Sequence, residues 1–395
     1  MAVGDIVSGY DGIREKQEAL YVDLHQHPEL SMEEERTRGI IADKLREFDY
    51  DVVEVGGGVV GVLENGDGPT VMLRADFDAL SIQEDTGLDY ASTVDGVMHA
   101  CGHDSHVAAL MGVAALMKDA TNAWSGTLEV LFQPGEETAE GAQSMVDAGV
   151  VDKVVKPDVM LGQHVFCSVV PAGSVAIKPG PVLSTATSVT VKVFGAGSHG
   201  SMPHLSVDPV VLASSIVMRL QTIVSRELNP SEFGVVTVGS VQAGSKANVI
   251  PFDATLKINI RAYDEDVRDK IIAAIERIVK AECEAARSPK EPEFSFSDRY
   301  PLTDNDADVT ARVRETLEEH LGSDRVQDAD RFTASEDFSV VADAFGTPYC
   351  YWIFGGGKEG EEIPNHSPFF APVQQLTLQT GTEALITAAY AWLGK

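Results

Sequence analysis

Residues 97–110 contain a high density of side chains that can bind metal ions. The stretch reads VMHACGHDSHVAAL and includes His99, Cys101, His103 and His106 within eight positions. A cysteine and a histidine two positions apart point to the same side of an extended backbone. A thiolate beside imidazoles suits Zn²⁺, Mn²⁺ or Co²⁺. A buried cysteine with surface histidines is the alternative interpretation, so the prediction depends on further ligands elsewhere in the chain.

An apolar run follows these residues and predicts a helix over 107–117. Asp104 or Ser105 is the expected N-cap, because a short oxygen-bearing side chain can accept the first free backbone N–H groups. We therefore expect the candidate ligands at the beginning of a helix.

Other candidate ligands follow predicted strands or lie in loops farther along the chain. With the cysteine and its neighbour they make a set of five, which are Cys101, His103, Glu137, His164 and His366. Two cations that share one ligand need about five protein ligands and a water molecule. The sequence therefore offers enough ligands for a dinuclear site.

Glu136 and Glu137 are adjacent on a turn that follows Pro-Gly, where neighbouring side chains diverge. One carboxylate can then bind a cation while the other takes a proton from a bound water and returns it to a leaving amine. A solvated acidic turn is the alternative for such a pair. The Cys-His motif elsewhere in the chain favours the catalytic interpretation.

The size and composition of the chain favour a globular protein with two domains. Its 395 residues are 44% hydrophobic and 23% charged, which allows two cores. The four cysteines are scattered without a CxxC pair, so we expect no disulfide framework. The first residues lack the basic and apolar regions of a signal peptide, and the longest apolar run is too short to cross a bilayer. We expect a cytoplasmic protein.

The net charge of −31 argues against two classes of partner. Nucleic acids and anionic membrane surfaces both require a basic surface, which a chain with 61 acidic and 30 basic residues does not favour. We expect neither nucleic acid nor a membrane as a partner. An anionic substrate must then be attracted by metal ions or by a few arginines.

Alternating strands and helices are expected to position the candidate ligands. Apolar strands at 70–74, 126–132 and 159–162 are each followed by polar residues, and α/β folds build their sites at the carboxyl ends of such strands. From 188 to 296 the pattern changes to β-α-β-β-α-β, which is the split-βαβ layout of a self-contained domain.

The fold prediction is an α/β protein with one domain inserted into another. A mixed-sheet α/β/α catalytic domain is expected to comprise residues 1–184 and 298–395. A ferredoxin-like (βαββαβ) domain is expected at 185–297.

Eight motifs occur in an order that matches a known family over nearly the whole chain. They are DLHQHPELSMEEERT, LRADFDALSIQEDTGLDY, MHACGHDSHVAALMGVA, FQPGEETAEGAQSMVDAG, GSHGSMPH, ANVIP, SEDF and NHSPFF. Together they resemble the metal-dependent amidohydrolases of the aminoacylase and carboxypeptidase superfamily, in the branch of hippurate hydrolases and auxin-conjugate hydrolases. The run LQTIVSRELNPSEFGVVTVGSVQAG is similar to N-acylglutamine aminoacylases.

The resemblance implies a metal site and a general base. Cys101 would bridge two divalent cations, with Zn²⁺ expected ahead of Mn²⁺ or Co²⁺, and Glu136 would be the base. The remaining ligands would be His103, Glu137, His164 and His366.

The resemblance also implies roles outside the metal ligands. His199 would polarise the scissile carbonyl at the partner subunit's site, in a homodimer formed through the inserted domain, which would also act as a lid. Asn248 and Arg261 would hold substrate oxygens or a carboxylate, although a strand arginine is also often a surface residue. Asp78 would orient a metal ligand or simply cap the end of a strand.

The implied reaction is the metal-dependent hydrolysis of the amide bond of N-acyl-L-amino acids, which are small molecules, to a carboxylic acid and an amino acid. A dipeptidase or carboxypeptidase on the same scaffold is the nearest alternative. Two further alternatives are Cys101 as a covalent nucleophile activated by a histidine and a metal-binding protein without catalysis. The latter would not need Glu136.

Overall fold

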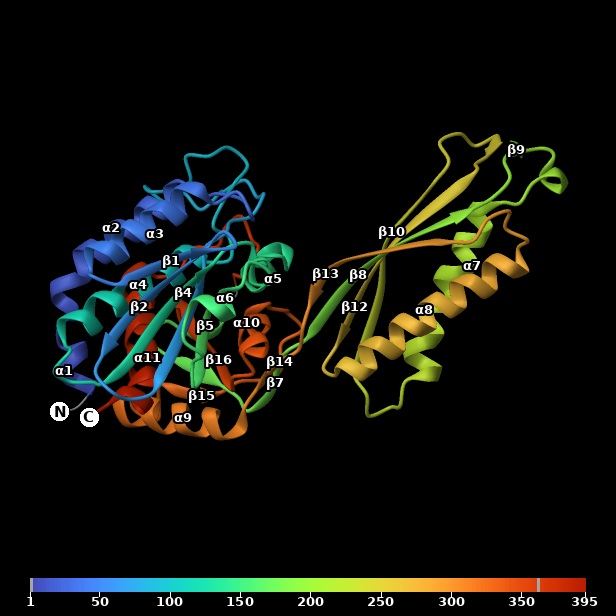
Figure 1. Cartoon of the computed structure of the whole chain (residues 1–395). Coiled ribbons are helices and arrows are strands. Elements are labelled where there is room, and N and C mark those ends of the chain that lie inside the picture. Colours follow the sequence, from blue (N-terminus) through green and yellow to red (C-terminus); the bar gives the residue numbers. More distant parts are fainter. Residues whose placement is uncertain (1–2, 361–362) are drawn as a thin grey trace. The chain divides into compact units, whose positions relative to one another are not determined.

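The structure is a computed structural model that describes residues 3–360 and 363–395. The chain divides into two compact units (Figure 1). Unit 1 covers the chain up to Val182, Asp304–Arg331 and the chain from Asp337 onwards. Unit 2 covers Leu183–Thr303 and Phe332–Glu336.

Unit 1 is built on an eight-stranded mixed sheet with the order β1-β2-β4-β3-β5-β16-β6-β15. Its strands are β1 (Asp51–Val55), β2 (Gly58–Asn65), β3 (Thr70–Asp76), β4 (Gly126–Gln133), β5 (Val159–Pro171), β6 (Val175–Ile177), β15 (Val326–Asp328) and β16 (Tyr349–Gly357). The neighbours β4, β3, β5 and β16 are parallel to one another. Every residue of β3 is buried, as expected for a parallel strand covered on both faces.

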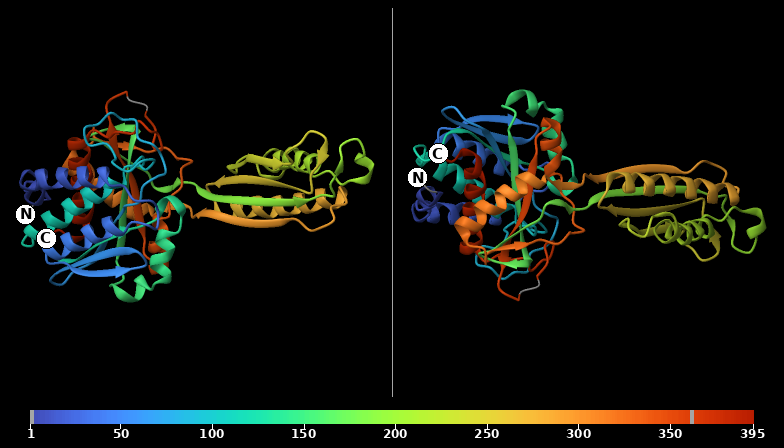
Figure 2. Two further views of the ribbon diagram at one scale, coloured as in Figure 1. Left: turned by 90° about the horizontal axis from the view of Figure 1, so that it is seen from above. Right: turned by 90° about the horizontal axis from the view of Figure 1, so that it is seen from below.

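Helices cover both faces of this sheet. They are α1 (Val3–Val7), α2 (Tyr10–Gln26), α3 (Glu35–Glu47), α4 (His103–Asp119), α5 (Gly141–Asp147), α6 (Val150–Lys153), α9 (Ala307–Leu321), α10 (Phe338–Phe345) and α11 (Gln374–Leu393). Figure 2 shows α2, α4 and α11 on one face and α5 and α10 on the other. The main hydrophobic core joins α4 and α11 to the sheet, so the predicted α/β/α layers are confirmed.

Unit 2 contains a four-stranded antiparallel sheet with the order β10-β12-β8-β13. Its strands and helices are β8 (Thr185–Phe194), α7 (Pro209–Thr222), β10 (Gly234–Ala243), β12 (Asp253–Ala262), α8 (Glu265–Ala285) and β13 (Glu293–Tyr300). Both helices pack their apolar residues on the sheet and form a core separate from that of unit 1. This element order is the predicted βαββαβ arrangement.

Smaller elements complete the fold. A short ribbon pairs β9 (Ser198–His199) with β11 (Val249–Ile250), and another pairs β7 (Gly180–Leu183) with β14 (Thr303–Asn305). Single helical turns are η1 (Glu136–Thr138) and η2 (Pro203–Leu205), and a π-helical turn η3 (Ile223–Glu227) extends α7. Among the described residues, no helix combines the length and apolar character needed to span a bilayer.

The beginning of α4 differs from the sequence prediction. The helix starts at His103 rather than after Asp104 or Ser105, and its N-cap position is Gly102, with a φ of 82° and no side-chain cap. A Cβ at this glycine would lie 2.3 Å from Cγ1 of Val165. Close packing and the left-handed backbone therefore both require glycine here. Asp104 does not cap the helix and instead contacts His25 at 2.7 Å.

Candidate metal centre

The candidate ligands come from the carboxyl ends of neighbouring strands in unit 1. Asp78 follows β3, Glu136 and Glu137 form η1 just after β4, and His164 lies within β5. His366 lies in the loop after β16, which is adjacent to β5 in the sheet. The sheet therefore brings together residues that are more than 280 positions apart, at the edge where parallel sheets build sites.

The predicted ligands form two overlapping groups. One ligand atom each from Cys101, His103 and His164 lie within 4.8 Å of one another, and the same holds for Cys101, Glu137 and His366. The Cys101 Sγ belongs to both groups and is 3.5 Å from Nε2 of His164. One cysteine sulfur therefore lies close to both groups of candidate ligands.

Polar atoms at this centre are buried without hydrogen-bond partners. Nε2 of His103 and Oε1 of Glu137 are both in this state among the described residues. They lie 3.9 Å apart, and Nε2 of His366 is 3.3 Å from the same Glu137 oxygen. Burying such atoms unsatisfied is unfavourable, whereas divalent cations would satisfy them. The donor set of thiolate, imidazoles and carboxylate fits Zn²⁺, Mn²⁺ or Co²⁺.

Asp78 contacts both His103 and the backbone of Glu137. Nδ1 of His103 lies 3.0 Å from Oδ1 of Asp78, and the N–H of Glu137 donates to Oδ2 at 2.9 Å. The Ser31 hydroxyl donates to the same oxygen at 2.7 Å. Burial would raise the pKa of Asp78, but these hydrogen bonds hold it below its usual value. The contact with Asp78 leaves Nε2 of His103 facing the Glu137 carboxylate, the arrangement expected of a carboxylate that orients a histidine ligand.

His106 and Asp76 are close to the ligands but are already engaged. Nδ1 of His106 donates to Oδ1 of Asp76 at 2.5 Å, and Nε2 accepts the N–H of Val165 at 2.9 Å. Asp76 also accepts from Arg74 at 2.6 Å. Burial would raise the pKa of Asp76, but Arg74 and the histidines keep it well below its usual range. Although Asp76, His103 and His106 are clustered, this pairing leaves Asp76 and His106 as a support for the centre.

Glu136 lies next to the ligands without belonging to either of the two groups that contain Cys101. It is 5% exposed, and its carboxylate lies within 4.8 Å of the ligand atoms of His103 and Glu137. Gly135, directly before it, has a φ of 54°, so the chain turns sharply between the end of β4 and the two glutamates. This position suits a base that acts on water held at the centre.

Asn365 is a neighbour of the centre that the sequence analysis did not single out. Its Nδ2 lies 3.6 Å from Sγ of Cys101 and donates to the backbone oxygen of Val165 at 3.0 Å. It therefore gives the cysteine sulfur a polar contact. Its position just before His366 in the motif NHSPFF was the available signal.

Unit 2 contains the other three predicted site residues. His199 is in β9 and pairs with Val249 of β11, and Asn248 directly precedes β11. The Gly200 N–H donates to the Asn248 backbone oxygen at 2.8 Å, and the side chains of His199 and Asn248 are exposed. Arg261 is on β12, and its Nη1 donates to Oγ of Ser335 at 2.7 Å. No carboxylate of the described residues forms an ion pair with Arg261, and burial lowers its pKa.

Known proteins resemble this chain over most of its length. The family model of peptidase family M20/M25/M40 matches residues 72–390. Thermostable carboxypeptidase 1 of Saccharolobus solfataricus is 36% identical, with 91% of each chain covered. The hippurate hydrolase of Campylobacter jejuni is also 36% identical and covers 83% of this chain and 85% of its own. A solved Bacillus subtilis structure, described as a dinuclear metal-binding peptidase, has a TM-score of 0.78 at 29% identity, with 96% and 98% of the chains covered.

Proposed function

Because this chain belongs to peptidase family M20/M25/M40, we propose that its metal centre hydrolyses the amide bond of N-acyl-amino acids. The enzyme is a metal-dependent hydrolase with a dinuclear site, as the predicted resemblance implied. The observation that carries the proposal is the pair of ligand groups that share Cys101, with the Glu136 carboxylate beside them.

Each residue of the centre has its own proposed role in the reaction. When bound, the two cations would polarise the scissile carbonyl and make a water molecule more acidic. Glu136 takes the proton of that water and returns it to the leaving amine. Asp78 holds His103 in position through the 3.0 Å contact. Of the possible metals, we propose Zn²⁺, which suits the mixture of thiolate, imidazole and carboxylate.

Residues of unit 2 are proposed to bind the substrate. Arg261 has a guanidinium group without an ion-pair partner among the described residues and suits the carboxylate of an N-acyl-amino acid. Asn248 is proposed to hold a substrate oxygen. The partner subunit's His199 is proposed to stabilise the oxyanion that forms on the carbonyl.

This arrangement requires a homodimer, which we propose is formed through the inserted domain of residues 185–297, with that domain also acting as a lid. Exposed apolar side chains on one helix of unit 2 support a contact there: Val210, Val211 and Met218 of α7 are 44%, 65% and 72% exposed. Exposed apolar surface of this kind is common at protein interfaces. The cytoplasmic location stays a prediction.

A carboxypeptidase or dipeptidase is the second candidate, because the chain is as similar to a thermostable carboxypeptidase as to a hippurate hydrolase, at 36% identity to each. Both reactions would use the same centre and differ only in the group on the acyl side of the bond. The ligands alone therefore do not separate the two activities.

The test is metal analysis of the purified enzyme combined with hydrolysis of a panel of N-acyl-amino acids and dipeptides. We expect two metal ions per chain, loss of activity on chelation, and a higher kcat/KM for N-acyl-amino acids. A clear preference for dipeptides would favour the second candidate. Activity that survives exhaustive chelation but is abolished by thiol alkylation would instead favour Cys101 as a nucleophile.

A further inference from the structure

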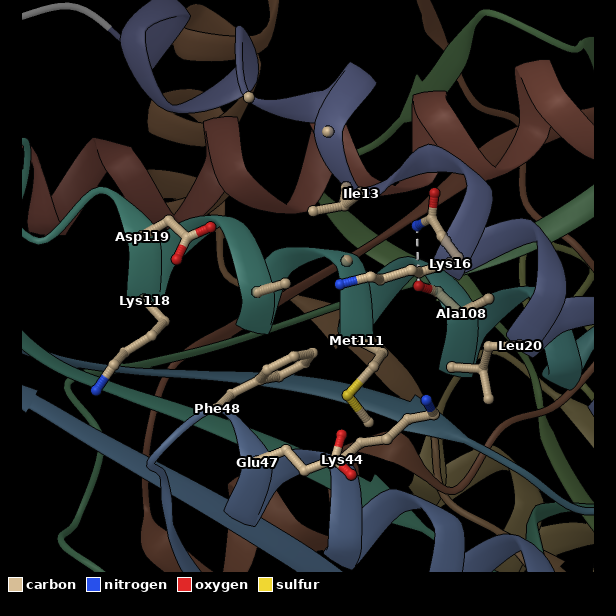
Figure 3. Close-up of a pocket in the computed structure, with 15 residues that line it drawn as sticks. Ile13, Lys16, Leu20, Lys44, Glu47, Phe48, Ala108, Met111, Lys118 and Asp119 are labelled. Carbon is tan, nitrogen blue, oxygen red and sulfur yellow. Dashed lines mark hydrogen bonds between the residues drawn. The ribbon is translucent and has the colours of Figure 1, made fainter.

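A pocket that the metal centre does not use lies in unit 1 between α2, α3 and α4 (Figure 3). Its volume is about 450 Å³, which falls in the range of pockets that hold small organic ligands. Met111 on its wall follows the proposed ligand His103 by eight residues on α4, or about 12 Å along the helix axis. The pocket is therefore separate from the reacting atoms.

Part of the wall of this pocket is apolar. Ile13, Leu20, Phe48 and Met111 contribute larger side chains, and Figure 3 shows Phe48 and Met111 at its centre. An apolar group of a ligand would displace water from these side chains.

Small residues keep the space between the helices open. A Cβ at Gly112 of α4 would come within 2.4 Å of Nε2 of Gln17, so close packing requires this glycine. At Gly12 of α2, by contrast, a Cβ would meet no atom within 4 Å. Glycine weakens a helix relative to alanine. No close contact among the described residues explains why position 12 is a glycine.

The charges at the pocket favour an anion. Three lysines line it, against two acidic residues, Glu47 and Asp119. Lys118 forms an ion pair with Asp49 at 3.2 Å, whereas the ammonium groups of Lys16 and Lys44 have no hydrogen bond or ion pair among the described residues. Two lysines without partners among the described residues therefore line one pocket of a chain with 61 acidic and 30 basic residues.

We propose that this pocket is a second binding site, for a carboxylate attached to a short apolar chain. The apolar part lies against Phe48 and Met111, and the carboxylate lies between Lys16 and Lys44. The proposal follows from the walls and charges of unit 1 and does not depend on the reaction at the metal centre.

The test uses the metal-loaded enzyme labelled with ¹³C at its methionine methyl groups, with the Met111 signal assigned from a Met111→Leu variant. Octanoate is added while the NMR spectrum is followed. We expect a saturable shift of the Met111 signal, and weaker shifts with acetate, which lacks the chain, and with 1-octanol, which lacks the charge. Because Met111 is the readout, a failure of the proposed hydrolysis would not affect the result.

Two variants test separately the contribution of the lysine charges and the contribution of the open volume at Gly12 to octanoate binding. Lys16→Ala/Lys44→Ala should weaken octanoate binding about fivefold or more, the effect of losing two exposed ion pairs. Gly12→Leu should abolish the shift while keeping the helix intact, since leucine is a better helix former than glycine. The control is Lys290→Ala in unit 2, which should bind normally. An unmoved Met111 signal, equal binding by the lysine variant or by 1-octanol, or normal binding by Gly12→Leu would overturn the proposal.

Discussion

Cys101 is the residue on which the proposed dinuclear arrangement depends, because its sulfur is common to the two candidate ligand groups described above. It is 7% exposed and lies one residue before Gly102, whose left-handed backbone (φ of 82°) favours glycine. Around it, each supporting side chain has a separate contact: Asp78 with His103 and Asn365 with Cys101 itself. The neighbouring Glu136 belongs to neither of these two groups, which is what the proposed proton transfer requires.

Replacing Glu136 with glutamine should remove the proton acceptor and leave the ligand set intact. We expect hydrolysis to fall by about 10²–10⁴-fold, the usual contribution of a general base, with two metal ions still bound per chain. Steady-state kinetics and metal analysis of the same preparation would measure both. Glu140→Gln, an exposed glutamate four positions away, is the matched control. Unchanged activity in Glu136→Gln would contradict the proposed role and favour a metal-binding protein without catalysis.

Replacing Asp78 with asparagine should loosen His103 without removing a ligand. Loss of such a supporting carboxylate usually lowers metal affinity or activity about 10–100-fold. Competition with a chelator would measure the affinity, and Asp85→Asn, at an exposed position of the same loop, should behave as the unaltered enzyme. Equal affinity in Asp78→Asn would show that Asp78 only supports the end of the strand.

The sequence indicated most of these residues but not how they are connected. Cys101, His103 and the two glutamates stand out because of their types and close spacing. Asn365, Ser31 and Arg74 do not, since a single asparagine, serine or strand arginine has many ordinary explanations. Their contacts join positions far apart in the chain and depend on the completed sheet, which a local pattern does not encode.

At the scale of elements, a buried ion cluster of His25, Asp104 and Glu84 holds the loop between β3 and α4 in place. His25 of α2 donates to Asp104 of α4 at 2.7 Å and contacts Glu84 of the loop at 3.2 Å. Glu84 also accepts the N–H of Ser92 at 2.7 Å. His25 therefore links a helix, a loop and the first turn of the helix that carries His103. From the sequence, Asp104 was expected to cap a helix, because the local pattern gives no sign of a partner 79 residues earlier.

This cluster should make stability depend on pH. Burial would lower the pKa of His25, but the hydrogen bonds of Asp104 and Glu84 raise it to about 10, from the usual 6.5. The folded chain then holds a proton that the unfolded chain releases, so stability is full below pH 6.5 and falls as the pH rises through 10. The fall is at most about 1.4 kcal/mol per pH unit for one proton.

Urea denaturation between pH 6 and pH 10 would measure that loss. His25→Gln should be less stable at pH 6 and should lose less stability on going to pH 10 than the unaltered enzyme. The control is His27→Gln, since His27 directly follows α2, is partly exposed and its ring contacts the nearby backbone oxygen and side chain of Asp23. Parallel curves for His25→Gln and the unaltered enzyme would contradict an imidazolium at position 25.

Element types were easier to predict than element limits. The strands at 70–76 and 126–133 and the βαββαβ order of unit 2 follow from apolar periodicity. The strand β5 was expected to end at 162 but continues to Pro171, because pairing with β16 holds the backbone extended beyond the apolar run. The three-residue strands β6 and β15 were not predicted, since such short segments carry too little periodicity.

At the scale of the whole molecule, the proposed function requires two chains. The metal ligands and Glu136 belong to one unit, and His199, Asn248 and Arg261 belong to the other. With a net charge of −31, two subunits would repel each other at long range, and salt would weaken that repulsion. An apolar contact through α7 is consistent with association in spite of this charge.

The proposed exchange of His199 between subunits can be tested by mixing two inactive variants. Glu136→Gln and His199→Ala, each purified and then unfolded and refolded together in equal amounts, should form mixed dimers with one intact site. About a quarter of the normal activity should return if subunits pair at random. His204→Ala, on the same loop, is the control and should be active alone. No recovery in verified mixed dimers would place His199 at the site of its own chain, and full activity of His199→Ala alone would place it outside the site.

The position of β16 beside β5 also affects the protein while it is being made. The two strands are neighbours in the sheet, but the ribosome must add all of unit 2 and more between them. At about 5–20 residues per second this takes roughly 10–40 s. During that time the growing chain contains the apolar strand β5 without its neighbour β16, so one edge of β5 is unpaired. An unpaired strand edge favours incorrect pairing between nascent chains. Production in the cell should therefore be more sensitive to chaperone supply and temperature than the stability of the finished enzyme suggests.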